Sequence, residues 1–141
     1  MKQVTLFSDG SCLGNPGNGG WAFILSYKNH ELKKSGFLDN TTNNQMEITA
    51  VIEGLKCLKE PCEVEIYTDS EYVVNSINSW IINWIKKDFA GIKNVELWKE
   101  FLKISKKHKI KAFWVKGHNG HPQNEWCDKY ARNAALTKEI I

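Results

Sequence analysis

The sequence predicts an α/β fold in which a mixed five-stranded sheet, a three-stranded antiparallel meander plus two parallel strands, is flanked by helices. Three alternating strand patterns come first, at about 3–9, 20–28 and 31–39, joined by a glycine-rich segment and by Lys28-Asn29-His30. Short connections of this composition favour antiparallel neighbours. Strand and helix patterns then alternate, which implies right-handed crossovers and parallel pairing.

A helix is expected at about 43–59, since Thr42 and Gln45 have the spacing of a capping box. Its apolar residues recur at helical spacing: Ile48, Val51, Ile52, Leu55 and Leu58. The remaining elements are a strand at 63–68, helices at about 71–87 and 95–107, a strand at 110–115 and a last helix at about 123–137. The length of 141 residues fits one domain, residues 1–141.

Composition narrows the class of protein. The net charge of +3 permits a polyanionic partner without requiring one. No apolar run approaches membrane-spanning length, and the N-terminus enters a strand pattern at once, so we expect a cytoplasmic protein with no membrane partner. We also expect it to be a monomer. The cysteines lack metal-site spacing and a secretory context, so reduced thiols are expected at Cys12, Cys57, Cys62 and Cys127.

Two groups of lysines differ in their setting. The lysines between 103 and 111 are best interpreted as a solvated helix face. Lys86, Lys87 and Lys93 instead follow Trp80 and Trp84. Tryptophans beside lysines suit a nucleic-acid backbone, so the second group is a candidate contact for a nucleic acid.

Carboxylates mark the candidate site. Asp9 and Asp69 each end a strand of the expected parallel pair, and open α/β sheets bind ligands at that edge. Glu47 is placed in the first turn of the helix before the second strand, and Asp128 lies on the last helix. Taken singly, these residues have ordinary explanations, because strand-end aspartates often cap turns and glutamate favours a helix N-terminus. Turn capping is a less satisfactory explanation for two aspartates that follow neighbouring parallel strands.

Clustered carboxylates resist ionisation unless a cation lies between them. All-oxygen ligands select hard cations, so the cluster predicts Mg²⁺, with Mn²⁺ as an alternative. Two such ions would suit in-line hydrolysis of a phosphodiester.

Two loops are candidates for further roles. The glycine-rich segment 14–20 leads into a strand with the wrong glycine spacing for a nucleotide-binding loop, so a hairpin is the better interpretation. In the loop 116–121, His118 lies between small residues with little packing to do, which favours proton handling. His121 precedes a helix start and is interpreted as a structural or capping residue.

Long motifs carry a resemblance over essentially the whole chain. The segments 9–17, 41–47, 68–73 and 115–118, then His121-Pro122, Asn124-Glu125 and Cys127-Asp128, closely resemble bacterial ribonuclease H of type 1, in order. The resemblance implies an endonuclease that hydrolyses the RNA strand of RNA/DNA hybrids. Contacts to the 2′-hydroxyl carry no base identity, so cutting should be largely independent of sequence. Water attack at a two-metal site predicts 5′-phosphate and 3′-hydroxyl ends. The resemblance also implies a metal-binding quartet of Asp9, Glu47, Asp69 and Asp128, with His118 assisting proton movement or product release.

The same resemblance implies a set of hybrid-binding residues. Cys12, Asn15, Asn43 and Asn44 would lie along the hybrid, Thr42 and Asn94 near a DNA phosphate, and Trp80, Asn83 and Trp84 in the channel for the DNA strand. Two features depart from the family's pattern: a short, modestly basic segment 85–94 and the negative charge of Glu71. The short segment puts tight, processive binding in doubt.

Two other classes of protein agree less well with the sequence. A junction resolvase or transposase core would share the acidic residues but not the asparagine-rich loop or the tryptophan segment. A module that binds hybrids without cutting them would be expected to lack at least one of the four carboxylates, and all four are present.

Overall fold

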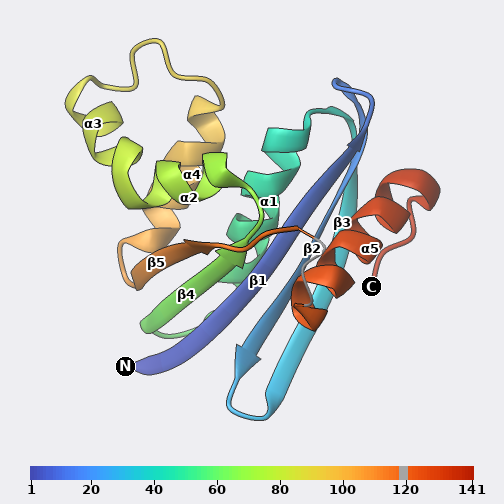
Figure 1. Cartoon of the computed structure of the whole chain (residues 1–141). Helices are drawn as coiled ribbons and strands as arrows, with labels where there is room; N and C mark the ends of the chain where they lie inside the picture. The colour runs from blue at the N-terminus through green and yellow to red at the C-terminus, as the bar shows by residue number, and fades with distance from the viewer. Residues whose placement is uncertain (118–120) are drawn as a thin grey trace.

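The computed structural model describes residues 1–117 and 121–141, and it shows one mixed sheet with helices on both faces (Figure 1). The strand order is β3-β2-β1-β4-β5. β1 pairs antiparallel with β2 and β2 with β3, whereas β1–β4 and β4–β5 are parallel. The predicted fold is therefore confirmed. The strands are β1 (Lys2–Leu13), β2 (Gly17–Tyr27), β3 (His30–Thr41), β4 (Cys62–Thr68) and β5 (Lys109–Trp114).

The helices divide between the two faces of the sheet. α1 (Asn43–Lys56) and α4 (Val95–Ser105) enclose the larger hydrophobic core together with one face of the sheet. α5 (Pro122–Thr137) packs against β1, β2 and β3 and encloses a smaller core. β2 serves both cores because successive side chains alternate, so that Phe23 and Leu25 join the larger core and Ala22 and Ile24 meet α5. Within the described residues, no helix is both long enough and apolar enough to cross a membrane. All four cysteines are free, as expected.

The first hairpin is longer than predicted. β1 and β2 remain paired up to Leu13 and Asn18, which confirms a hairpin and not a nucleotide-binding loop. The glycines that suggested a loop are instead needed for close packing. A Cβ on Gly20 would lie 2.1 Å from the carbonyl oxygen of Ala131, so α5 approaches β2 only because Gly20 has no side chain.

The single helix expected at about 71–87 is interrupted. α2 (Glu71–Asn75) passes into a π-helical turn, η1 (Ser76–Trp80), before α3 (Ile81–Lys86). Asn78 explains the interruption, since its Nδ2 donates to the Ala112 carbonyl at 2.8 Å and its Oδ1 accepts from the Ala112 N–H at 3.0 Å. This contact ties the turn to the edge strand β5, a tertiary effect that local periodicity does not report.

Candidate active site

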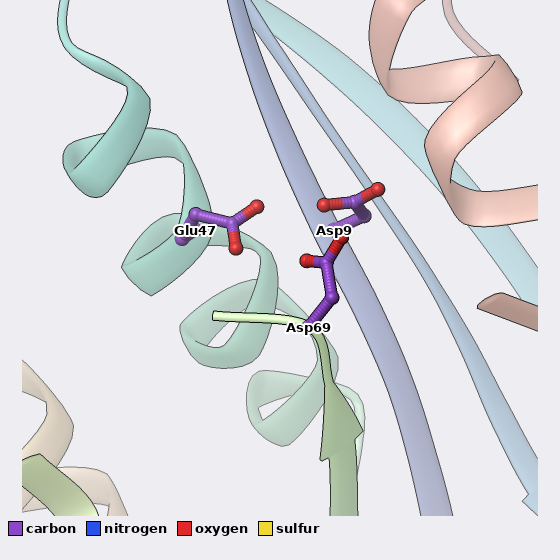
Figure 2. A group of neighbouring side chains, drawn as sticks. All are labelled: Asp9, Glu47 and Asp69. Carbon is purple, nitrogen blue, oxygen red and sulfur yellow. The ribbon is translucent and has the colours of Figure 1, made fainter. Parts of the chain in front are cut away.

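Three carboxylates from three elements meet at one edge of the sheet. Asp9 lies on β1, Asp69 directly follows β4 and Glu47 belongs to α1. One oxygen from each lies within 4.8 Å of the others. Figure 2 shows the three side chains turned towards a common space. Asp9 and Glu47 are buried and Asp69 is exposed, so the cluster opens to solvent on the Asp69 side.

Gly10 allows α1 to approach β1 closely enough for this meeting. A Cβ on Gly10 would lie 2.4 Å from the backbone nitrogen of Glu47 and 2.5 Å from the carbonyl carbon of Met46. The Gly10 N–H donates to Glu47 Oε1 and to Asp9 Oδ1, which orients both carboxylates. The predicted place of Glu47 was wrong. α1 begins at Asn43 and has no acidic residue in its first turn, so the helix N-terminus does not explain Glu47.

The electrostatics of the cluster follow from burial. Desolvation raises the pKa of Asp9 from 3.8 to about 7, and the nearby charges of Asp69 and Asp128 add to the rise. Desolvation also raises the pKa of Glu47 well above its ordinary value, with the charge of Asp9 as the next cause. Buried carboxylates in this state favour a bound cation, which would offset their repulsion.

Asp128 lies near the three carboxylates but not within their 4.8 Å group. It lines one hollow with Asp9 and Asp69, and a second that also includes Glu47. Its Oδ2 accepts from Arg132 Nη2 at 3.0 Å, one helical turn further along α5. The structure thus brings three of the four predicted carboxylates together and places the fourth on the same hollow.

Several further residues line the hollow between β4, β5 and α5. They include Lys116, His121, Asn124 and Glu125, for which the sequence alone indicates no catalytic role. Asn124 Nδ2 donates to the Tyr67 carbonyl at 3.0 Å and so ties α5 to β4. His121 occupies the N-cap position of α5, as the capping interpretation expected, but its exposed side chain makes no capping hydrogen bond. His118 lies outside the described residues. The sequence signal for the four lining residues was their place within the motifs that resemble ribonuclease H.

The candidate hybrid-binding residues near the hairpin form one connected region. Asn15 Oδ1 accepts from the Asn43 N–H at 3.1 Å, and Cys12 Sγ donates to the Thr41 carbonyl at 3.2 Å. Asn43 also lines the hollow that contains Asp9 and Glu47. Asn44 is exposed beside it, and Thr42 caps α1 in the predicted capping box. The β1–β2 turn and the start of α1 therefore extend from the carboxylates as one polar surface.

The tryptophan segment forms a second candidate surface. The ring centroids of Trp80 and Trp84 are 6.4 Å apart, and Trp84 packs against the buried Trp98 at 5.7 Å. Trp80 is 43% exposed, enough to offer a ring face to a partner, and Asn83 is exposed between the two tryptophans. Glu71 lies in the first turn of α2, where its charge favours the helix N-terminus.

Comparison with known proteins agrees with this geometry. A family model described as RNase H matches residues 1–136. The chain belongs to the ribonuclease H family. Ribonuclease H of Campylobacter concisus is 66% identical over 136 residues, which cover 96% of this chain and 94% of that protein. Ribonuclease HI of Campylobacter jejuni is 60% identical over 136 residues, covering 96% of this chain and 93% of that protein.

A solved structure shares the fold. LC9-RNase H1, described as a type 1 RNase H with the type 2 active-site motif, matches with a TM-score of 0.86 at 27% identity. The match covers 99% of this chain and 77% of that one. The predicted resemblance to bacterial ribonuclease H of type 1 is confirmed, and the chain is a ribonuclease H, a nuclease of the hydrolase class.

Proposed function

We propose that the chain hydrolyses the RNA strand of a hybrid with two Mg²⁺ ions held by Asp9, Glu47, Asp69 and Asp128, leaving 5′-phosphate and 3′-hydroxyl ends. The observation that carries this proposal is the meeting of three carboxylates within 4.8 Å, two of them buried. Burial of two acidic groups side by side is costly without a compensating cation, so the arrangement is better explained by metal binding than by fold stability.

The residues fit the proposed ions. Their ligands are all carboxylate oxygens, the donor type that Mg²⁺ and Mn²⁺ prefer, and one face of the cluster remains open for a substrate and waters. Bound divalent cations would lower the pKa of an attacking water and offset the charge on the leaving oxygen.

The protein side of the mechanism is positioning. The Gly10 N–H fixes the orientation of Glu47, and the Arg132 guanidinium holds Asp128 at the wall of the hollow. Asp69 is the exposed member of the three and faces the side from which a phosphodiester would enter. For His118 we retain the proposal of proton movement or product release, on sequence grounds alone.

Hybrid recognition is proposed to use two surfaces. Cys12, Asn15, Asn43 and Asn44 offer short polar groups beside the carboxylates, a chemistry suited to 2′-hydroxyls in a wide minor groove. Contacts of this kind read no base identity, so cleavage should be independent of sequence.

The DNA strand is proposed to lie against the other surface. Trp80, Asn83 and Trp84 would form its channel, and Thr42 and Asn94 would contact one of its phosphates. The exposed lysines 86, 87 and 93 lie in the same part of the chain and add positive charge.

We further propose that residues 1–141 act as a single catalytic domain and as a cytoplasmic monomer. Sedimentation velocity with and without hybrid tests the oligomeric state, because a monomer sediments with the mass of one chain, 16.2 kDa, when substrate is absent.

Substrate discrimination tests the proposed function. Labelled hybrid, duplex RNA and duplex DNA are incubated with the protein in Mg²⁺, in Mn²⁺ and in EDTA. Cutting is expected only of RNA in the hybrid and only with metal. Asp69→Asn should abolish turnover while hybrid binding persists, and Asp39→Asn, which removes an exposed carboxylate from β3, serves as the matched control. Equal turnover by wild type and Asp69→Asn would refute the assignment.

A further inference from the structure

Gln45 joins the start of α1 to residues far along the chain. Its Oε1 accepts from Thr41 Oγ1 at 2.7 Å and from the Thr42 N–H at 3.3 Å, while its backbone N–H donates to Thr42 Oγ1 at 3.2 Å. These contacts complete the capping box. Its Nε2 then donates to Asn94 Oδ1 at 3.4 Å, across 49 positions of sequence.

Asn94 continues the connection to Tyr72. Asn94 Nδ2 donates to the Tyr72 hydroxyl at 3.2 Å, and Trp98 Nε1 donates to the same hydroxyl at 2.9 Å. Trp98 is fully buried, so its ring fixes the position of the Tyr72 hydroxyl. The resulting hydrogen-bond network links β3, α1, α2 and α4 through side chains.

Obligate donors at the two ends determine the direction of every bond in this network. The Thr42 backbone N–H only donates, so the Gln45 oxygen must face it and the Gln45 nitrogen must face Asn94. The Asn94 oxygen therefore faces Gln45, and its nitrogen faces Tyr72. The indole N–H of Trp98 also only donates, so the Tyr72 oxygen accepts from it.

With the bonds in this direction, the network uses the amide oxygens as acceptors and leaves several hydrogens unused. The amide oxygens of Gln45 and Asn94 both accept bonds within the network, as does the Thr42 hydroxyl oxygen. The hydrogens that the network does not use are the second amide hydrogens of Gln45 and Asn94 and the hydroxyl hydrogens of Thr42 and Tyr72. Unused donors gathered in this way suit an anionic oxygen.

The start of α4 supports the same conclusion. Asn94 occupies the N-cap position of this helix in the left-handed region, with φ of 58°, yet its side chain makes no capping hydrogen bond. Asparagine at this position ordinarily accepts from the first turn of the helix. Here its oxygen is held by Gln45 instead, and the positive end of the helix dipole lies beside the unused donors.

We propose that Gln45 and Tyr72 are positioning residues, which hold the Asn94 side chain with its N–H outward and so fit it to one phosphodiester oxygen of the DNA strand. The inference rests on the proposed contact of Thr42 and Asn94 with a DNA phosphate. Neither Gln45 nor Tyr72 needs to touch the reacting phosphate. We therefore expect substitutions at these two residues to weaken hybrid binding and to leave the rate of the chemical step unchanged.

Two substitutions of similar volume test the proposal. Gln45→Met removes the donor to Asn94, and Tyr72→Phe removes the hydroxyl that accepts from it. The Kd for a fluorescent hybrid, measured by anisotropy in EDTA so that no cutting occurs, should rise about three- to tenfold in each variant, while kcat at saturating hybrid with Mg²⁺ stays unchanged. Gln3→Met, at an exposed glutamine at the start of β1, is the matched control and should leave both quantities unchanged.

The same two substitutions made in an Asn94→Ala protein separate an effect on the position of Asn94 from an effect on helix stability. If both residues act through Asn94, neither substitution should raise Kd further when added to Asn94→Ala, whereas a loss of helix capping alone would persist there.

A set of hybrids, each with one uncharged methylphosphonate at a different position of the DNA strand, gives a second readout. At one position the methylphosphonate should raise the Kd of the wild-type protein and have little effect on the Kd of Gln45→Met. Unchanged Kd in both single variants, or effects that persist fully in Asn94→Ala, would overturn the proposal. Because Kd is measured without turnover, a failure of the proposed cleavage chemistry is distinguishable from a failure of this inference.

Discussion

Replacing Asp9 with asparagine removes one charge from the buried carboxylate cluster while keeping side-chain volume. Burial and the neighbouring carboxylates raise the Asp9 pKa from 3.8 to about 7. Since one pKa unit corresponds to about 1.4 kcal/mol, ionised Asp9 costs the metal-free native state about 4 kcal/mol. Asp9 and Glu47 share this cost through their mutual contact, so a gain of about 2 kcal/mol is expected for Asp9→Asn, or roughly 6 °C in Tm for a chain of this size.

The pH dependence of the gain identifies its cause. A carboxyl whose pKa is higher in the folded than in the unfolded state gives stability that is complete below about pH 4 and is lost as pH rises through about 7. The Tm difference between Asp9→Asn and wild type should therefore be small at pH 4, grow towards pH 7 and stay level beyond it. Differential scanning calorimetry in EDTA at pH 4, 6 and 8 measures this, and Mg²⁺ at pH 8 should narrow the difference.

Asp88→Asn is the matched control, because Asp88 is exposed and outside the cluster. Its Tm should stay within about 2 °C of wild type at each pH, as surface substitutions usually change stability by no more than about 0.5 kcal/mol. An Asp9→Asn variant that melts at or below wild type at pH 8 in EDTA would refute the reasoning. A gain of equal size at pH 4 and pH 8 would also contradict it.

Three other predictions follow from single contacts. Gly10→Ala places a Cβ 2.4 Å from the Glu47 backbone nitrogen, so it should cost about 1 to 3 kcal/mol of unfolding free energy in denaturant titrations and reduce kcat. Asn124→Ala removes the bond from α5 to β4, so hybrid turnover should fall with little change in Kd. Burial and then Lys107 lower the pKa of His108, whose Nδ1 accepts from the Cys62 N–H at 3.1 Å. Its stability contribution is present above about pH 6.5 and lost as pH falls, so His108→Asn should flatten the acid side of the Tm profile.

Local patterns predicted the fold and the meeting of the carboxylates. Strand alternation, helical spacing and the Thr42–Gln45 capping box each depend on a few neighbouring residues, and the structure contains all of them. The meeting of Asp9 and Asp69 follows from the parallel pairing of β1 and β4, whose register ends at Phe7 and Tyr67, although β1 itself continues past Asp9 to Leu13.

Tertiary contacts account for what the sequence did not reveal. Gly20 was predicted to begin a strand, but only the approach of α5 explains why that position needs a glycine. The π-helical turn depends on the bonds between Asn78 and Ala112, and the role of Gln45 depends on Asn94. Each of these pairs is more than 30 positions apart in the sequence, beyond the reach of any periodicity.

Analysis of the cleavage ends tests the central claim most directly. A hybrid with a labelled RNA strand is cut by wild-type protein in Mg²⁺, and the products are examined by mass spectrometry, with EDTA and Asp69→Asn reactions alongside. Carboxylate-held divalent cations and water attack predict 5′-phosphate and 3′-hydroxyl ends in Mg²⁺ and no products in the other two reactions. Cyclic-phosphate ends, or cutting that continues in EDTA, would contradict the account.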